Sequence, residues 1–186
     1  MAFDPLIHHR RSIRLKGFDY SSRGLYFVTI CTHRREQFLG RIENAQSIPA
    51  ETGKAVLAAW FDLPRRFPSV ELDAFVVMPN HVHGILVLVG TGMPVGGHFI
   101  RGAASSAPTL GDVMRAFKSI SGIAINRILG RSGVPAWQRN YYEHIIRDSR
   151  ELDGAQRYIA DNPLRWQFDP ENPLATHADG AMPWGQ

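Results

Sequence analysis

The sequence predicts an α+β fold: a ferredoxin-like βαββαβ sandwich with an antiparallel sheet and one additional helix near the C-terminus. Strand-like and helix-like stretches follow one another in the order strand, helix, strand, strand, helix, strand, helix. The short link Pro79-Asn80 between the second and third strands indicates an antiparallel pair. The chain has 186 residues, 44% of them hydrophobic, which fits one compact domain.

The first half of the chain contains three predicted strands and one predicted helix. Residues 25–32 (LYFVTICT) are β-branched and aromatic and follow a Ser-Ser-Arg-Gly turn, which predicts a strand. Residues 51–67 carry apolar side chains at helical spacing and end before Pro68. Residues 72–78 and 81–89 are short apolar runs on either side of the turn, and they form the predicted strand pair.

The second half adds two helices and a strand. A glycine-rich stretch at 90–108 is a predicted flexible loop. Residues 110–129 have an apolar stripe at helical spacing, and residues 137–146 are a predicted strand. Residues 148–162 form the last predicted helix, since Asp148 and Glu151 have the spacing of a capping box and Pro163 follows.

The same patterns predict one domain at residues 1–168 and a loosely ordered acidic tail at residues 169–186. The single cysteine, Cys31, cannot form a disulfide within the chain, which favours a reducing compartment. Every apolar run is too short to cross a bilayer, and the first residues lack the pattern of a secretory signal. We therefore expect a cytoplasmic protein without a membrane partner.

Positive charge is concentrated in two blocks of the sequence. Residues 1–41 carry eight basic and three acidic side chains, and residues 114–150 carry seven and two. Two such blocks either merge into one patch that binds a polyanion or form two separate solvated faces.

The pair His81 and His83 is the first candidate for chemistry. Residues two apart on a strand point to the same face of a sheet, so both imidazoles can reach one cation. Because the pair follows the turn at residues 78–80, we expect both side chains to be partly exposed at the start of a strand. The alternative is a pair of histidines packed on a sheet.

Tyr158 and Asn162 are the second candidate. They are four residues apart in the last predicted helix and so lie on one face, where they could bring a nucleophile and a third metal ligand together. The alternative is a tyrosine at the rim of the core and an asparagine that ends the helix. The third candidate is the stretch 137–147, in which basic and aromatic residues interleave as in strands that bind nucleic acid. The alternative is an amphipathic strand whose aromatic residues face the core.

The chain also lacks some motifs. It has no phosphate-binding loop of the Gly-x-x-x-x-Gly-Lys-Ser/Thr type and no Gly-x-Ser-x-Gly elbow. ATP-driven chemistry and hydrolysis by an elbow serine are therefore unsupported.

Three blocks in this order make the sequence resemble the single-tyrosine HUH transposases, and among them the REP-associated tyrosine transposases of bacteria. The blocks are Met78-Pro79-Asn80-His81-Val82-His83-Gly84-Ile85, then Trp137-Gln138-Arg139 with Tyr142-Glu143-His144-Ile145-Ile146-Arg147, and then Tyr158-Ile159 with Asn162-Pro163. The resemblance implies that His81 and His83 bind a divalent metal, that Tyr158 on the last helix is the nucleophile, and that Asn162 takes the third ligand position. Many relatives have Gln there, and the shorter Asn ligates either directly or through water.

The resulting hypothesis is a transposase that cleaves and rejoins single-stranded DNA through a 5′-phosphotyrosine intermediate, with Mg²⁺ or Mn²⁺ as cofactor. An adjacent DNA hairpin is the expected handle, the enzyme is a monomer or homodimer, and it works in the cytoplasm on the nucleoid. The residues expected to contact DNA are Arg10, Arg11, Arg14, Lys16, Arg139, His144 and Arg147. Two rival hypotheses stay open: a nucleic-acid-binding repressor without catalysis, and a metal-dependent hydrolase that forms no covalent intermediate.

Overall fold

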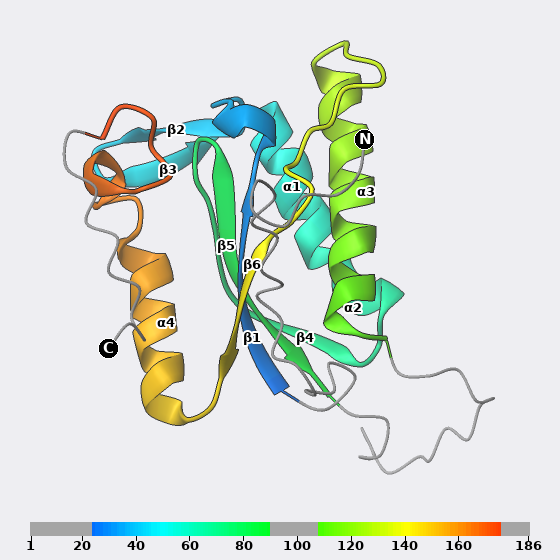
Figure 1. The fold of residues 1–186 in the computed structure, drawn as a ribbon, viewed down its shortest axis with the longest axis vertical. Helices are drawn as coiled ribbons and strands as arrows, with labels where there is room; N and C mark the ends of the chain where they lie inside the picture. Colours follow the sequence, from blue (N-terminus) through cyan, green and yellow to red (C-terminus); the bar gives the residue numbers. More distant parts are fainter. Residues whose placement is uncertain (1–23, 90–107, 176–186) are drawn as a thin grey trace, which may run out of the picture.

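The computed structural model describes residues 24–89 and 108–175, and the predicted loop at 90–108 lies almost entirely outside them. Within these ranges the chain forms six strands and four α-helices (Figure 1). They are β1 (Gly24–Cys31), β2 (Gly40–Glu43), β3 (Gln46–Pro49), α1 (Glu51–Phe61), α2 (Leu63–Arg66), β4 (Val70–Val77), β5 (His81–Leu88), α3 (Leu110–Ile128), β6 (Tyr142–Ile146) and α4 (Ser149–Asp161). None of these helices is long and apolar enough to cross a membrane.

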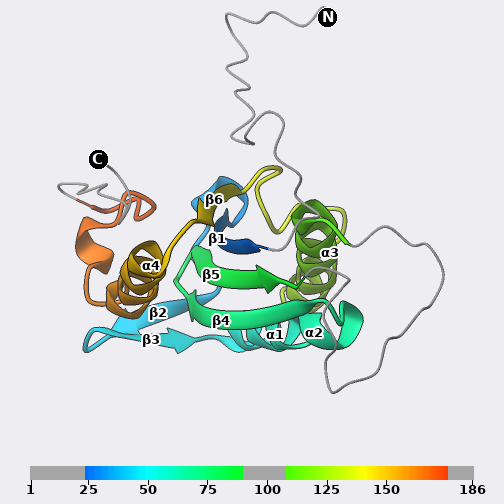
Figure 2. The same ribbon diagram turned by 90° about the horizontal axis from the view of Figure 1, so that it is seen from below.

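The main sheet has the strand order β4-β5-β1-β6, and each neighbouring pair is antiparallel. This is the strand order of a ferredoxin-like sheet once β2 and β3 are set aside, so the predicted fold class is confirmed. Helices α1 and α3 cover one face of the sheet, and α4 lies against the opposite face (Figures 1 and 2). The additional C-terminal helix therefore encloses a second, smaller apolar core.

Strand β5 supplies side chains to both cores because alternate residues of a strand face opposite sides. Val82 and Leu86 belong to the large core shared with α1 and α3, whereas Ile85 belongs to the small core beneath α4. His81 and His83 have the same parity as Ile85. The strand pattern therefore directs both imidazoles toward α4 and away from the larger core.

Gly84 lets two aromatic side chains approach the large-core face of β5. Trp60 is fully buried and stacks on Phe75 with ring centroids 4.3 Å apart. A Cβ atom on Gly84 would lie 2.5 Å from Trp60 and 2.8 Å from Phe75. The position therefore has no room for a methyl group.

We expect Gly84→Ala to lower the free energy of unfolding by about 1–3 kcal/mol, because the added methyl group overpacks a core that has little room to adjust. Gly122→Ala in α3 is the matched control, since its nearest neighbours would be 3.7 Å away. That control should stabilise the helix by about 0.5–1 kcal/mol. Urea denaturation measures the free energy of unfolding of both variants. An equal change in the two would contradict the packing argument.

The structure differs from the sequence prediction at three elements. The β2-β3 hairpin was not predicted, since its strands have four residues each and its turn, Asn44-Ala45, lacks the usual glycine although both residues have positive φ. The helix predicted at 51–67 is broken at Asp62 into α1 and α2. The strand predicted at 137–146 is regular only from Tyr142, and Trp137 forms an isolated bridge to Thr32.

The N-cap predicted for the last helix is present in α4, whereas the residues after α4 differ from the prediction. The Asp148 side chain accepts a hydrogen bond from the Glu151 backbone N–H at 2.8 Å, as the capping pattern predicts. The Glu151 carboxylate, however, contacts Arg147 N and His144 Nε2. In residues 169–175, which the sequence assigned to a loose tail, Asp169 and Asn172 are buried, whereas Leu174 is 80% exposed. The remainder of that tail, 176–186, lies outside the described residues.

Candidate active site

The two histidines of the His-Val-His motif lie side by side at the start of β5. Their rings are 4.5 Å apart between centroids, and the two Nε2 atoms are 3.0 Å apart. The predicted common face is therefore present. Partial exposure was a wrong expectation, because the side chains are 0% and 1% exposed. The strand start is covered by α4 and by the segment that follows it.

Each histidine is held through its Nδ1 atom. The Nδ1 atom of His81 lies 2.9 Å from Asn80 Oδ1, and the Nδ1 atom of His83 lies 2.8 Å from the Thr29 hydroxyl. Thr29 pairs with His83 on one side and with Tyr142 on the other, so these three residues form a row across β5, β1 and β6. These contacts leave the Nε2 atoms facing one another, as needed for a shared cation.

Asp169 completes a group of three buried residues that could hold a metal ion. Its Oδ2 atom is 3.7 Å from His81 Nε2, and the candidate ligand atoms of Asp169 and both histidines lie within 4.8 Å of one another. Sequence reasoning missed Asp169 by placing it in a tail. No local sequence pattern marks this return, and Phe168, directly before Asp169, is itself 44% exposed.

Asn162 also reaches this group. It follows α4 directly, is 3% exposed, and its Oδ1 atom has no hydrogen-bond partner within the described residues. The Asn162 amide opposes the shift that burial causes in the pKa of His81, Tyr158 and Asp169, raising the first and lowering the other two, so it lies beside all three. Because an unpaired buried oxygen is unfavourable, this atom fits a cation ligand.

The donor set suits a divalent cation. Burial lowers the pKa of His81 to about 3, and burial together with His81 lowers the pKa of His83 well below its usual value. Both imidazoles are therefore neutral at physiological pH, which is the form that binds metals. Two ligands about 2.1 Å from one octahedral ion lie about 3.0 Å apart, which matches the distance between the Nε2 atoms.

Tyr158 lies on α4 one turn before Asn162, with its ring against His83 and Phe27. The ring centroids are 5.2 Å and 5.9 Å apart, both in edge-on geometry. Burial, followed by the negative charge of Asp169, raises the pKa of Tyr158 to about 12. The phenol is therefore protonated at neutral pH, and its proton has to be lost when the oxygen acts as a nucleophile.

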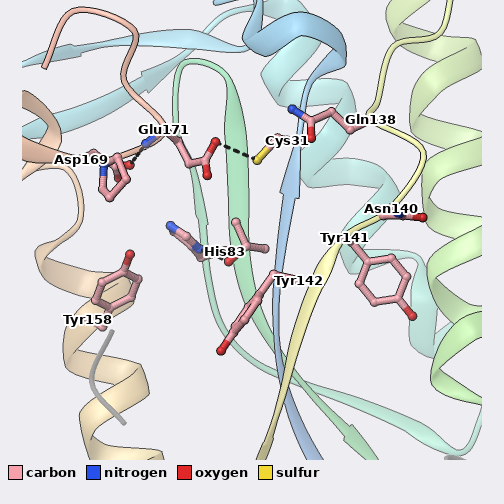
Figure 3. Close-up of a pocket in the computed structure, with 11 residues that line it drawn as sticks. Cys31, His83, Gln138, Asn140, Tyr141, Tyr142, Tyr158, Asp169 and Glu171 are labelled. Atoms are coloured by element: carbon pink, nitrogen blue, oxygen red, sulfur yellow. Dashed lines mark hydrogen bonds between the residues drawn. The ribbon is translucent and has the colours of Figure 1, made fainter. Parts of the chain in front are cut away.

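A cavity of about 250 Å³ opens beside these residues. Figure 3 shows Tyr158 on one side, His83 and Tyr142 along the sheet, and Asp169 and Glu171 on the segment across from them. Gln138 and Asn140, from the loop before β6, line the far side. The cavity gives a substrate access to the tyrosine and to the buried ligand group.

The residues expected to contact DNA are not all near the cavity. Arg139 is exposed and lies between the two cavity residues Gln138 and Asn140. Arg147 is exposed five residues beyond Tyr142, about 16 Å away along the strand direction. His144 Nε2 lies 3.2 Å from Glu151 at the first turn of α4, and His144 is two residues further along β6 than Tyr142, the residue in the row of His83. The expected contacts Arg10, Arg11, Arg14 and Lys16 lie outside the described residues.

Comparison with known proteins finds one relative by sequence and, among solved structures, a protein with a similar fold. An uncharacterised protein of Haemophilus influenzae is 39% identical over 177 residues, which cover 88% of this chain and 93% of that protein. The chain belongs to the same protein family as this relative. No protein-family model matches the sequence.

Among solved structures, this chain is similar to a REP-associated tyrosine transposase bound to a REP hairpin. The match has a TM-score of 0.54 and 21% identity, and it covers 82% of this chain and 74% of the transposase. The two chains therefore share a fold, and any activity in common rests on the arrangement of the side chains.

Proposed function

We propose that this protein is a transposase-like enzyme that cleaves and rejoins single-stranded DNA with Tyr158 as nucleophile and a divalent metal as cofactor. The observation that carries the proposal is that Tyr158 lines one cavity together with His83 and Asp169, two members of the buried group His81, His83 and Asp169 that could hold a metal ion. The fold shared with a tyrosine transposase adds support.

The roles follow from the chemistry of the side chains. The Tyr158 oxygen attacks the scissile phosphorus, an O–P bond forms, and the bond from phosphorus to the 3′ oxygen breaks. The phenol loses its proton, and the released 3′ oxygen takes one up. Since one phosphodiester replaces another, the step stores the bond energy for rejoining. No nucleotide cofactor is needed for this exchange.

His81, His83, Asp169 and Asn162 would hold the cation. When bound, Mn²⁺ or Mg²⁺ polarises a phosphate oxygen and supplies positive charge beside the phenol. Two imidazoles with two oxygen donors favour Mn²⁺ over Mg²⁺. Compensation of the Asp169 charge removes one cause that raises the pKa of Tyr158, while burial, the largest cause, remains.

The substrate should be single-stranded at the cut. The ligand group is buried, and a regular duplex cannot present a phosphate to it without unpairing. The similar transposase was solved with a REP hairpin, so a hairpin next to the cleavage site is our proposed handle. The enzyme would act on the bacterial nucleoid as a monomer or homodimer.

Labelled DNA tests this proposal directly. The protein is incubated with Mn²⁺ and a single strand that carries label at either end, and the denatured protein is then examined. We expect the 3′-labelled fragment to stay on the protein and the 5′-labelled fragment to be released. Capture of the 5′-labelled fragment, or efficient cleavage of a full duplex, would contradict the mechanism.

The same assay separates the two rival functions. A repressor binds the strand without cutting it, so the DNA stays intact and no label remains on the denatured protein. A metal-dependent hydrolase releases both fragments and leaves no label on the denatured protein.

Affinity for single-stranded DNA should fall steeply with salt if arginines hold its phosphates. Each phosphate contact contributes about −0.7 to the slope of log K against log salt concentration. Arg139→Ala should therefore reduce the magnitude of the slope by about 0.7. Arg131→Ala is the control, since Arg131 already pairs with Glu36 at 2.7 Å and should leave the slope unchanged. Fluorescence anisotropy at several salt concentrations gives the slopes. A slope near zero for the unmodified protein would exclude a phosphate-binding groove.

A further inference from the structure

Asn80 is a fully buried residue in the turn between β4 and β5 that contacts three parts of the chain. Its Nδ2 atom donates to the backbone oxygens of Glu171 at 2.6 Å and of Arg35 at 3.3 Å. Its Oδ1 atom lies 2.9 Å from His81 Nδ1. One amide therefore joins a candidate metal ligand to the segment that follows α4.

These contacts fix the tautomer of His81. An amide nitrogen only donates and an amide oxygen only accepts. Since the nitrogen of Asn80 faces two carbonyl oxygens, its oxygen must face His81 and accept the proton on Nδ1. The Nε2 atom of His81 then keeps its lone pair. Thr29 imposes no such choice on His83, because a hydroxyl both donates and accepts.

The same amide anchors residues 169–172, which we call the strap. Glu171 makes most of the contacts that hold the strap. Its carboxylate forms an ion pair with Arg35 at 2.7 Å and accepts a hydrogen bond from Cys31 Sγ at 3.3 Å. Within the strap, the Asp169 carboxylate accepts from the Glu171 backbone N–H at 2.7 Å. The position of Asp169 thus depends on where Glu171 is held.

We propose that Asn80 is a positioning residue that couples the strap to the metal site, by setting the tautomer of His81 and the place of Asp169 through one side chain. This inference rests on the proposed metal site. The positions of His81 and Asp169 are then linked, because the Asn80 amide orients His81 directly and Asp169 through the strap.

Two substitutions of Asn80 separate its contact with His81 from its contact with the strap. Asn80→Asp keeps an oxygen that accepts from His81 Nδ1 but loses the donor to Glu171. Asn80→Leu has a similar volume and loses both. Gln138→Leu is the control, because it removes an amide that lines the same cavity and that makes no side-chain hydrogen bond to His81 or the strap within residues 24–89 and 108–175.

The first measurement uses the full chain without metal or DNA. Nitrogen-15 NMR of the histidine rings should show the Nδ1–H tautomer of His81 in the unmodified protein, Asn80→Asp and Gln138→Leu. In Asn80→Leu we expect that tautomer to be lost or mixed. Hydrogen exchange at the strap amides should be at least tenfold faster in both Asn80 variants and unchanged in Gln138→Leu.

The second measurement is Mn²⁺ affinity by calorimetry. Loss of a residue that orients a metal ligand lowers affinity by about 10–100-fold, and we expect a loss in this range for Asn80→Leu and a smaller one for Asn80→Asp. An Asn80→Asp variant with unchanged strap exchange would overturn the coupling, even if Asn80→Leu fails to fold. So would a folded Asn80→Leu variant that keeps the His81 tautomer.

Failure of the proposed function has a different signature. In that case the unmodified protein binds no Mn²⁺, or forms no adduct with DNA, while the tautomer and exchange data still report on Asn80.

Discussion

Tyr158→Phe is expected to abolish cleavage of single-stranded DNA and the covalent adduct, with a loss of at least about 10⁴-fold in rate, as is usual when a nucleophile is removed. The substitution removes only the hydroxyl, and the ring keeps its contacts with His83 and Phe27. DNA affinity should stay within about threefold, since a variant that loses only a transition-state interaction binds substrate as before.

Tyr142→Phe is the matched control, because Tyr142 lines the same cavity from β6. It should cleave at close to the normal rate. The measurement is single-turnover cleavage with gel analysis of the denatured protein. Normal cleavage by Tyr158→Phe would transfer the nucleophile role to another residue, with Tyr141 and Tyr142 as the candidates at the cavity.

His83→Gln is expected to reduce Mn²⁺ affinity by about 100-fold or more, because it removes a residue that binds the metal directly. Loss of a residue that only hydrogen-bonds to a metal ligand already lowers affinity by about 10–100-fold. We choose Gln over Ala because His83 is buried, so that truncation would leave a cavity and add about 2–4 kcal/mol of destabilisation. Cleavage should fall in parallel with metal occupancy and recover in part at high Mn²⁺ concentration.

His144→Gln is the control for this experiment. His144 lies on the same side of the sheet, but its Nε2 atom contacts Glu151 and is separate from the ligand group. Calorimetric titration with Mn²⁺ compares the two variants. Equal affinities in His83→Gln and the unmodified protein would mean that the two histidines are packing residues only.

The sequence predicted those parts of the site that depend on local periodicity. A strand places His81 and His83 on one face, and a helix places Tyr158 and Asn162 on one face, so their side chains could be grouped from spacing alone. The antiparallel pairing of the strands around a short turn was predictable for the same reason.

Features that depend on distant packing could not be predicted in this way. Asp169 joins the histidines because residues 169–172 fold back onto β1 and the turn at Asn80, and no local pattern encodes that return. The burial of the histidines has the same origin. The β2-β3 hairpin was missed since its strands are short and its turn residues are atypical.

The row formed by Tyr142, Thr29 and His83 makes the site sensitive to how β1 is aligned with its neighbours. A slip of β1 by one residue would bring Val28 or Ile30 opposite His83, and the imidazole would lose its hydroxyl partner to an apolar side chain. Transfer of the His-Val-His motif alone to another hairpin should therefore give a weak site. A transplant needs all three strands, and metal uptake can serve as a readout of correct strand alignment during refolding.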